Sequence, residues 1–275
     1  MSMLWGSTFV AQQIGMQRGL GPLTFNALRF ALGACVLLPL VCRRRTGLPV
    51  TVPWRGSILA GLFLFAAAGL QQVGLLYTTS ANAGFITSLY ILFVPLLGLL
   101  FGHRAPRSLW AGALVCVAGL YLLSLGSDIT MRQGDVLVLV CAVLWAAQIV
   151  TIQHLARFGD PFKIAVIQFV VCAVLSAVGA LLVESLTLKS LYAGSGAVAY
   201  AGVFSVGIAF TLQIVCQKHC PLGTAAVIMS MEAVFAALAG YLVLGQTLSA
   251  RAWGGCFLIL CGVLVVQLVP LMRRR

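Results

Sequence analysis

Long apolar runs follow one another along almost the whole chain, separated by short groups of polar, charged, glycine and proline residues. A transmembrane helix needs about 20 mostly apolar residues to cross a hydrocarbon core of about 30 Å. Because most intervals hold only about 2–6 residues, consecutive helices are predicted to be antiparallel neighbours. The runs predict ten membrane-spanning helices, at residues 1–17, 22–42, 54–77, 80–102, 107–125, 134–155, 161–184, 193–217, 221–244 and 250–270.

The composition supports an all-α, polytopic membrane protein. Of the 275 residues, 61% are hydrophobic and only 8% are charged, and the mean hydropathy is +1.08. A soluble domain has about 45–50% apolar and about 25% charged residues. The composition therefore excludes soluble enzymes and nucleic-acid-binding proteins, and the short intervals leave no room for a soluble domain.

The distribution of basic residues predicts the orientation in the membrane, because lysine and arginine accumulate in cytoplasmic loops. If the N-terminus is cytoplasmic, the outer loops hold Arg18, Arg132, Lys189 and Arg251. The inner loops and tail then hold Arg43, Arg44, Arg45, Arg55, Arg104, Arg107, Arg157, Lys163, Lys218, Arg273, Arg274 and Arg275. Both termini are therefore predicted to be cytoplasmic, and this bias accounts for the net charge of +12 without a polyanionic partner.

Two of the predicted helices have unusual features. Pro95 lies deep within the run 80–102, so a kink is expected there, since proline lacks the N–H of a helical hydrogen bond. The run 1–17 is short and polar and has neither the basic region nor the cleavage site of a signal peptide. We therefore expect the chain to begin about one or two turns into its first helix.

The sequence contains a weak internal repeat. A shift of 143 residues aligns Trp110 with Trp253 and Gly119 with Gly262. The two predicted repeats cover residues 1–125 and 134–270. Because each holds five helices, an odd number, the second repeat crosses the membrane in the opposite sense to the first. Inverted repeats of this kind characterise secondary transporters, whose site lies at the repeat interface near the bilayer midplane.

Several segments resemble a known family. The segments LWGSTFVAQQIG, TSANAGFITSLYILFVPLLGLLFG and MEAVFAALAGYLVLGQ are similar to the EamA type of the drug/metabolite transporter superfamily. The resemblance implies a secondary transporter of the cytoplasmic (inner) membrane that exports a small metabolite, an amino acid or a drug-like molecule by alternating access. Two positions depart from the family pattern: Ala233 replaces its usual proline, which is expected to straighten the ninth helix, and Gln246 replaces its usual glutamate.

Two charged residues fall within the predicted hydrocarbon core, where charge costs about 2.5–3.5 kcal/mol on insertion scales and suggests function. Glu232 lies about 18 Å and Arg29 about 10 Å below the predicted outer surface, at about 1.5 Å rise per residue. One interpretation is that Glu232 exchanges protons or binds a cationic substrate group. The alternatives are a structural ion pair between the two residues and an arginine that extends to the interface.

Neutral polar residues predict which helices surround a cavity. They are frequent in the first four helices of each predicted repeat and rare in 107–125 and 250–270, which are expected to stand outside. The predicted substrate-binding or coupling residues are Glu232, Arg29, Thr8, Gln12, Gln72, Asn82, Tyr90, Trp145, Gln148 and Gln213. For each glutamine the alternative is an interhelical hydrogen bond, worth about 0.6 kcal/mol, and for Trp145 the alternative is simple packing.

The remaining function classes are a membrane-embedded enzyme and a receptor or scaffold that transports nothing. The sequence lacks a phosphate-binding loop, an HExxH motif and zinc-like Cys/His spacing, so neither a cofactor nor a metal is expected. The nine cysteines are interpreted as free thiols, mostly in apolar runs. The expected partners are a small-molecule substrate and the lipid bilayer, with a proton as a candidate coupling ion and a homodimer as a candidate assembly; no nucleic acid is expected.

Overall fold

A computed structural model describes residues 1–43, 52–78, 80–124, 133–245 and 247–272. Every regular element in these ranges is a helix. The helices are α1 (Ser2–Gln17), α2 (Pro22–Arg43), α3 (Trp54–Gly74), α4 (Ser80–Ser88), α5 (Tyr90–Leu100), α6 (Arg107–Ser124), α7 (Gln133–Leu155), α8 (Pro161–Val183), α9 (Leu188–Tyr200), the π-helix η1 (Ala201–Phe210), α10 (Thr211–Gln217), α11 (Leu222–Met229), α12 (Glu232–Leu244) and α13 (Ala250–Met272).

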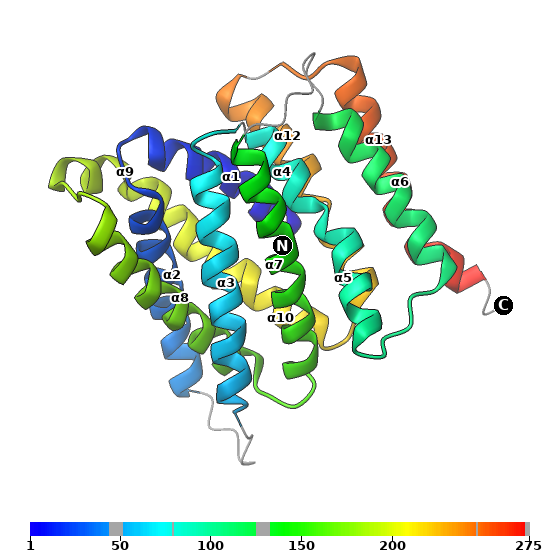
Figure 1. Ribbon diagram of the computed structural model, residues 1–275, viewed down its shortest axis with the longest axis horizontal. Coiled ribbons are helices and arrows are strands. Elements are labelled where there is room, and N and C mark those ends of the chain that lie inside the picture. The colour runs from blue at the N-terminus through cyan, green and yellow to red at the C-terminus, as the bar shows by residue number, and fades with distance from the viewer. Residues whose placement is uncertain (44–51, 79, 125–132, 246, 273–275) are drawn as a thin grey trace.

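The predicted all-α polytopic fold is confirmed. Eight helical stretches in the described residues are long and apolar enough to cross a membrane, and Arg107–Leu123 is a shorter apolar helix. The predicted count of ten spans is not reproduced in full, because α1 has only 16 residues and Arg107–Leu123 is also short of a full span. In Figure 1, α2 and α7 end, and α3 and α8 begin, at the lower side of the bundle, which is the side that the basic residues predict to be cytoplasmic.

Two of the spans are interrupted midway, each between a pair of short helices. The first interruption, between α4 and α5, is at Leu89 and not at Pro95, where a kink was expected. The Leu92 amide donates to the Leu89 carbonyl at 2.9 Å, a bond across three residues that tightens the turn. Pro95 itself lies inside the regular helix α5, so the position of this interruption does not follow from the missing N–H group of the proline.

The second interruption lies at Ser230–Met231, between α11 and α12. There the Ala233 amide donates to the Ser230 carbonyl at 3.2 Å, again across three residues. The expectation that Ala233 straightens this helix is therefore wrong. Because no proline is present, the interruption does not depend on a missing N–H group and is a property of how the segment packs.

The helices α6 and α13 stand together at one side of the molecule (Figure 1). Glycines bring their backbones into contact: a Cβ on Gly112 would lie 2.7 Å from the Gly262 carbonyl oxygen, and one on Gly119 would lie 2.7 Å from that of Gly255. The order of these contacts makes the two helices antiparallel. An inverted repeat would pair corresponding helices in this way, and the division into two repeats remains a prediction.

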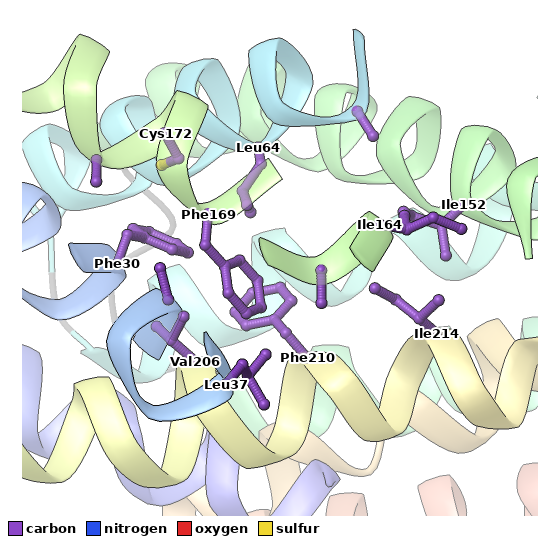
Figure 2. Packing of buried hydrophobic residues seen from close by; sticks show 14 of the residues in the cluster. Phe30, Leu37, Leu64, Ile152, Ile164, Phe169, Cys172, Val206, Phe210 and Ile214 are labelled. Carbon is purple, nitrogen blue, oxygen red and sulfur yellow. The ribbon is translucent and has the colours of Figure 1, made fainter. Parts of the chain in front are cut away.

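Aromatic side chains form the centre of the largest apolar cluster (Figure 2). Phe30 on α2, Phe169 on α8 and Phe210 at the end of η1 have ring centroids 6.0 Å apart in each pair. Phe30 and Phe169 are completely buried. Burying such side chains stabilises a helix contact by about 1.5–3 kcal/mol each in water; within lipid the same contacts act through close packing.

Carboxylates satisfy the exposed amides at two helix N-termini. Glu184, directly after α8, accepts hydrogen bonds from the Leu23 amide at 2.7 Å and the Thr24 amide at 2.8 Å, so it caps the neighbouring helix α2. Asp160 accepts from the Phe162 amide at 2.8 Å at the start of α8. Glu184 thus joins α8 to α2, Asp160 caps its own helix, and Asp135 on α7 accepts from the Thr78 hydroxyl. Among the described acidic residues, Glu232 differs because its buried Oε1 atom has no hydrogen-bond partner.

Candidate functional site

A central cavity lies where the interrupted helices meet the other spans. Its volume is about 50 Å³, enough for a few water molecules and well below the roughly 300–1,000 Å³ of a typical ligand pocket. It is lined by Trp5, Thr8, Phe9, Gln12, Arg29, Gln71, Thr87, Tyr90, Trp145, Ile149, Ser205, Phe210, Gln213, Met229 and Glu232. None of these residues belongs to α6 or α13, as the polar pattern predicts.

Glu232 is placed at the cavity by the interruption before α12, of which it is the first residue. Its side chain is only 5% exposed, and its Oε1 atom makes no hydrogen bond. Tyr90, the first residue of α5, occupies the corresponding place after the other interruption, and it lines the same cavity as Glu232. Both interrupted helices therefore place an ionisable or hydroxyl group in this cavity.

Arg29 enters the cavity from α2 and is 3% exposed. Its guanidinium carbon lies 4.9 Å from the centroid of Phe30 and 5.7 Å from that of Phe25, and its Nε atom makes no hydrogen bond. The Oε1 atom of Glu232 likewise has no hydrogen-bond partner, so it does not pair with this guanidinium group. The ion pair considered from the sequence is thus not formed in this conformation, and one cation and one carboxylate share the cavity without neutralising each other directly.

Aromatic rings form one wall of the cavity. The ring centroid of Phe210 lies 5.0 Å from that of Trp5 and 5.6 Å from that of Trp145, and the Trp145 and Phe210 planes are stacked at 20°. The Nε1 atoms of both tryptophans are buried without a hydrogen-bond partner. Trp145 therefore both packs and lines the cavity, and the two indole N–H groups remain as free donors.

Of the ten residues predicted from the sequence, seven line this cavity: Glu232, Arg29, Thr8, Gln12, Tyr90, Trp145 and Gln213. Their roles in binding or coupling remain a prediction. The Oε1 atoms of Gln12 and Gln213 make no hydrogen bond, whereas the Thr8 hydroxyl donates to the Leu4 carbonyl of its own helix.

Two of the other three predicted residues do not line the cavity, and the side chain of the third lies outside the described part of the structure. Gln148 is buried between helices, where its Nε2 donates to Gln168 at 3.1 Å and its Oε1 accepts from Gln213 at 3.3 Å. Gln72 is completely buried away from the cavity. The side chain of Asn82, on α4, is outside the described part of the structure.

Sequence reasoning missed several lining residues. Gln71 takes the place expected for its neighbour Gln72, and its Nε2 donates to the Thr87 hydroxyl at 3.0 Å. Ser205 and Phe210 reach the cavity from η1, whose wider turn changes which side chains face inward. Apolar and single-hydroxyl residues carry no signal that separates a cavity wall from ordinary packing.

The cavity gathers buried polar atoms without hydrogen-bond partners in the protein. They are Trp5 Nε1, Gln12 Oε1, Arg29 Nε, the Tyr90 hydroxyl, Trp145 Nε1, Gln213 Oε1 and Glu232 Oε1. Each such atom costs about 1–3 kcal/mol unless water or a ligand satisfies it. Because donors and acceptors are both present, the cavity can bind a small polar molecule that carries both kinds of group. Among the described residues, no cluster of three His, Cys, Asp or Glu side chains could hold a metal.

Three curated proteins similar to this chain are transporters. An uncharacterized transporter of Archaeoglobus fulgidus is 32% identical over 276 residues, covering 97% of this chain and 83% of that protein. The uncharacterized inner membrane transporter YedA of Escherichia coli is 26% identical, covering 96% of this chain and 87% of its own. The threonine/homoserine exporter RhtA of Salmonella typhimurium is 28% identical, covering 88% of this chain and 79% of its own.

The fold also matches a solved structure. A crystal structure with 24% sequence identity superimposes with a TM-score of 0.82, covering 98% of this chain and 94% of that one. The model of the EamA-like transporter family matches residues 1–125 and 132–268, which is nearly the whole chain. The described helices form the membrane-spanning bundle that such a transporter requires. This multi-pass membrane protein therefore belongs to the EamA-like transporter family.

Proposed function

We propose that this protein exports amino acids, taken up in zwitterionic form, through the central cavity. The observation that carries the proposal is that Arg29 and Glu232 line one cavity, are both almost completely buried, and each have a buried polar atom without a hydrogen-bond partner. A buried charge without a partner is costly, and a ligand with two opposite charges satisfies both at once.

The chemistry assigns one end of the substrate to each charge. A guanidinium group binds a carboxylate through charge-assisted, bidentate hydrogen bonds, so Arg29 takes the α-carboxylate. The Glu232 carboxylate accepts from the α-ammonium group, together with the free Oε1 atoms of Gln12 and Gln213. Trp5 and Phe210 supply the apolar surface for the side chain. With Glu232 protonated, the empty cavity carries the single positive charge of Arg29, and the occupied cavity is neutral overall once the zwitterion has bound and the proton has left.

The similarity to RhtA supports this substrate class and the direction. That relative is a threonine/homoserine exporter, and both of its named substrates are small hydroxylated amino acids. The hydroxyl and amide groups of this cavity, Thr87 and Gln71 among them, suit a substrate with a polar side chain. Export through a protein of the inner membrane then follows by analogy.

Transport requires the cavity to open, because about 50 Å³ holds a few waters rather than an amino acid. The interruptions at Leu89 and at Ser230–Met231 are the positions where helices can bend without breaking a regular hydrogen-bond ladder. Since Tyr90 and Glu232 directly follow these interruptions, bending would move the two groups with respect to Arg29. Bending would therefore change the shape of the cavity and the positions of its polar groups together, as alternating access requires.

A proton is the proposed coupling ion, with Glu232 as its carrier. In the empty cavity the carboxylate is desolvated and lacks a cationic partner, conditions that favour its neutral form. Binding of the substrate ammonium favours the ionised form and releases the proton. Exchange of a proton for a substrate at one carboxylate is the simplest link between a proton gradient and export.

The test is counterflow exchange in liposomes with L-threonine and two analogues of different charge. L-threonine is zwitterionic, its amide lacks the carboxylate and is cationic, and N-acetylthreonine lacks the ammonium and is anionic. Wild-type protein is expected to exchange L-threonine and discriminate at least about tenfold, or about 1.4 kcal/mol, against each analogue.

The variants assign the two ends of the substrate. Arg29→Gln should lose discrimination against the amide alone, and Glu232→Gln should lose discrimination against N-acetylthreonine alone. Arg251→Gln is the matched control, because Arg251 is exposed and neither it nor its aromatic partner, Tyr121 on α6, lines the cavity. Equal exchange of all three compounds by the wild type would contradict the proposed substrate class.

A further inference from the structure

A second and much larger cavity opens at the side of the bundle that is predicted to be cytoplasmic. Its volume is about 880 Å³. It lies between the end of α5, the start of α6, the ends of α7 and α13, and the start of α11. We call it the vestibule, and define it by the charged and imidazole side chains that line it: His103, Arg104, Arg157, Lys218 and His219.

The vestibule has one sign of charge. Three of its side chains are cationic and two are imidazoles, and the described residues that line it include neither aspartate nor glutamate. A concave surface lined by a single sign of charge focuses the field and concentrates counter-ions. The positive-inside rule accounts for basic residues on this side of the membrane, but it does not require that they surround a cavity of ligand size.

The vestibule also contains the uncapped N-terminus of α11. This eight-residue helix begins after Pro221, and no side chain caps it. The amides of Leu222, Gly223 and Thr224 precede the first helical bond, which the Ala225 amide makes to the Pro221 carbonyl at 2.9 Å. All three residues line the vestibule, and such free amides bind anions.

The contrast with the other helices strengthens this point. At α2 and α8 a carboxylate of the protein occupies the N-terminus, from Glu184 and from Asp160. At α11 the corresponding place has no carboxylate, and the side chains around it are basic. In addition, the Nδ1 atom of His103, also in the vestibule wall, is buried without a hydrogen-bond partner. The vestibule thus offers several kinds of hydrogen-bond donor, and its described lining residues include no carboxylate.

An apolar layer separates the vestibule from the central cavity. Ile149 and Met229 line the central cavity, Leu222 lines the vestibule, and all three belong to one cluster of buried apolar residues. A charged molecule in the vestibule therefore does not reach Arg29 or Glu232 in this conformation. Occupation of the vestibule and binding in the central cavity are separate events.

We propose that the vestibule binds a phosphate group. Two guanidinium groups, one ammonium group and the amides at the start of α11 match the several oxygens and the two negative charges of a phosphate better than a single carboxylate. The volume also accommodates the molecule that carries the phosphate. That molecule is a soluble phosphorylated metabolite or a phospholipid of the inner leaflet, and the experiment distinguishes the two. The inference does not rest on the proposed amino-acid substrate.

The probe is inorganic phosphate, added to the purified protein in nanodiscs of phosphatidylcholine alone. Phosphate is expected to raise the Tm in a saturable way, whereas sodium chloride at equal ionic strength is not. In the triple variant Arg104→Gln/Arg157→Gln/Lys218→Gln, the phosphate concentration at half-saturation should increase at least tenfold. A control with the same loss of charge is Arg43→Gln/Arg55→Gln/Lys163→Gln, since these residues share the predicted side but do not line the vestibule.

Further measurements separate the sources and guard against misfolding. If the occupant is a lipid, nanodiscs with phosphatidylglycerol should abolish the phosphate response of the wild type; if it is a soluble metabolite, the response should persist. The single variant Lys218→Gln provides the same comparison if the triple variant does not fold. Equal responses to phosphate and chloride, or equal losses in the vestibule and control variants, would overturn the proposal, and amino-acid exchange is not involved in either outcome.

Discussion

The central cavity and the α6–α13 pair are built on opposite principles. Around the cavity, helices are interrupted, and buried polar atoms lack partners, among them one of an arginine and one of a glutamate. In α6 and α13 the helices are continuous, and glycine contacts bring the backbones together. The comparison indicates that the protein concentrates its unfavourable interactions where we propose movement and binding, and holds the peripheral pair by close packing.

The largest expected effect is on folding, from filling the contact between α6 and α13. A Cβ at Gly255 would lie 2.6 Å from the Gly119 carbonyl oxygen, whereas one at Gly254 would meet nothing within 4 Å. Gly255→Leu should therefore abolish folded protein in size-exclusion chromatography, while Gly254→Leu should elute and exchange substrate like the wild type. Normal elution and exchange by Gly255→Leu would show that α6 and α13 tolerate separation, and would contradict the claim that close packing holds them together.

The next effect is on transport, from removing the charge of Glu232. Glu232→Gln should lower gradient-driven transport by at least about 100-fold, equivalent to about 2.7 kcal/mol, with little change in Tm, because no ion pair is lost. In the wild type, substrate exchange measured with equal substrate concentrations on both sides should rise with pH, because the carboxylate must be ionised to bind an ammonium group. The variant should lose this dependence. Wild-type rates with unchanged pH dependence would exclude Glu232 as the coupling group.

A smaller effect tests whether the two charges of the cavity are independent in the absence of substrate. A double-mutant cycle of Arg29→Gln and Glu232→Gln should give a coupling energy in thermal or chemical unfolding below about 0.5 kcal/mol, as for residues without shared contacts. Partial rescue of an unstable Glu232→Gln by Arg29→Gln would instead reveal a structural ion pair, which is costly to break on one side. The cavity would then resemble the rest of the bundle more closely.

The smallest effect concerns Tyr90. Removal of one hydroxyl from a polar site costs about 0.5–1.5 kcal/mol, so Tyr90→Phe should reduce exchange only a few-fold while preserving the Tm. Tyr121→Phe on α6 is the matched control, because Tyr121 is exposed and away from the cavity. A loss as large as that of Glu232→Gln would mean that the Tyr90 hydroxyl itself is needed for the proton step.

The sequence by itself determined the membrane class, the positions of most spans and the two ionisable residues, Arg29 and Glu232, that line the cavity. These follow from properties of single segments: a span must be apolar over the thickness of the bilayer, and a charge inside it is rare whatever its neighbours are. Glu232 and Arg29 were therefore identifiable without any contact information. The low polarity of 107–125 and 250–270 likewise predicted that α6 and α13 stand outside the cavity.

Only the tertiary structure decided which polar side chains share the cavity. Gln71 and Gln72 differ by about 100° around the same helix, and the packing of α3 turns Gln71 toward the cavity. Gln148 is identical in type to Gln213, yet its amide is used between helices. The interruption at Leu89, rather than at Pro95, likewise depends on neighbouring helices. Such properties concern pairs of segments, and hydropathy along one chain carries no information about which faces will meet.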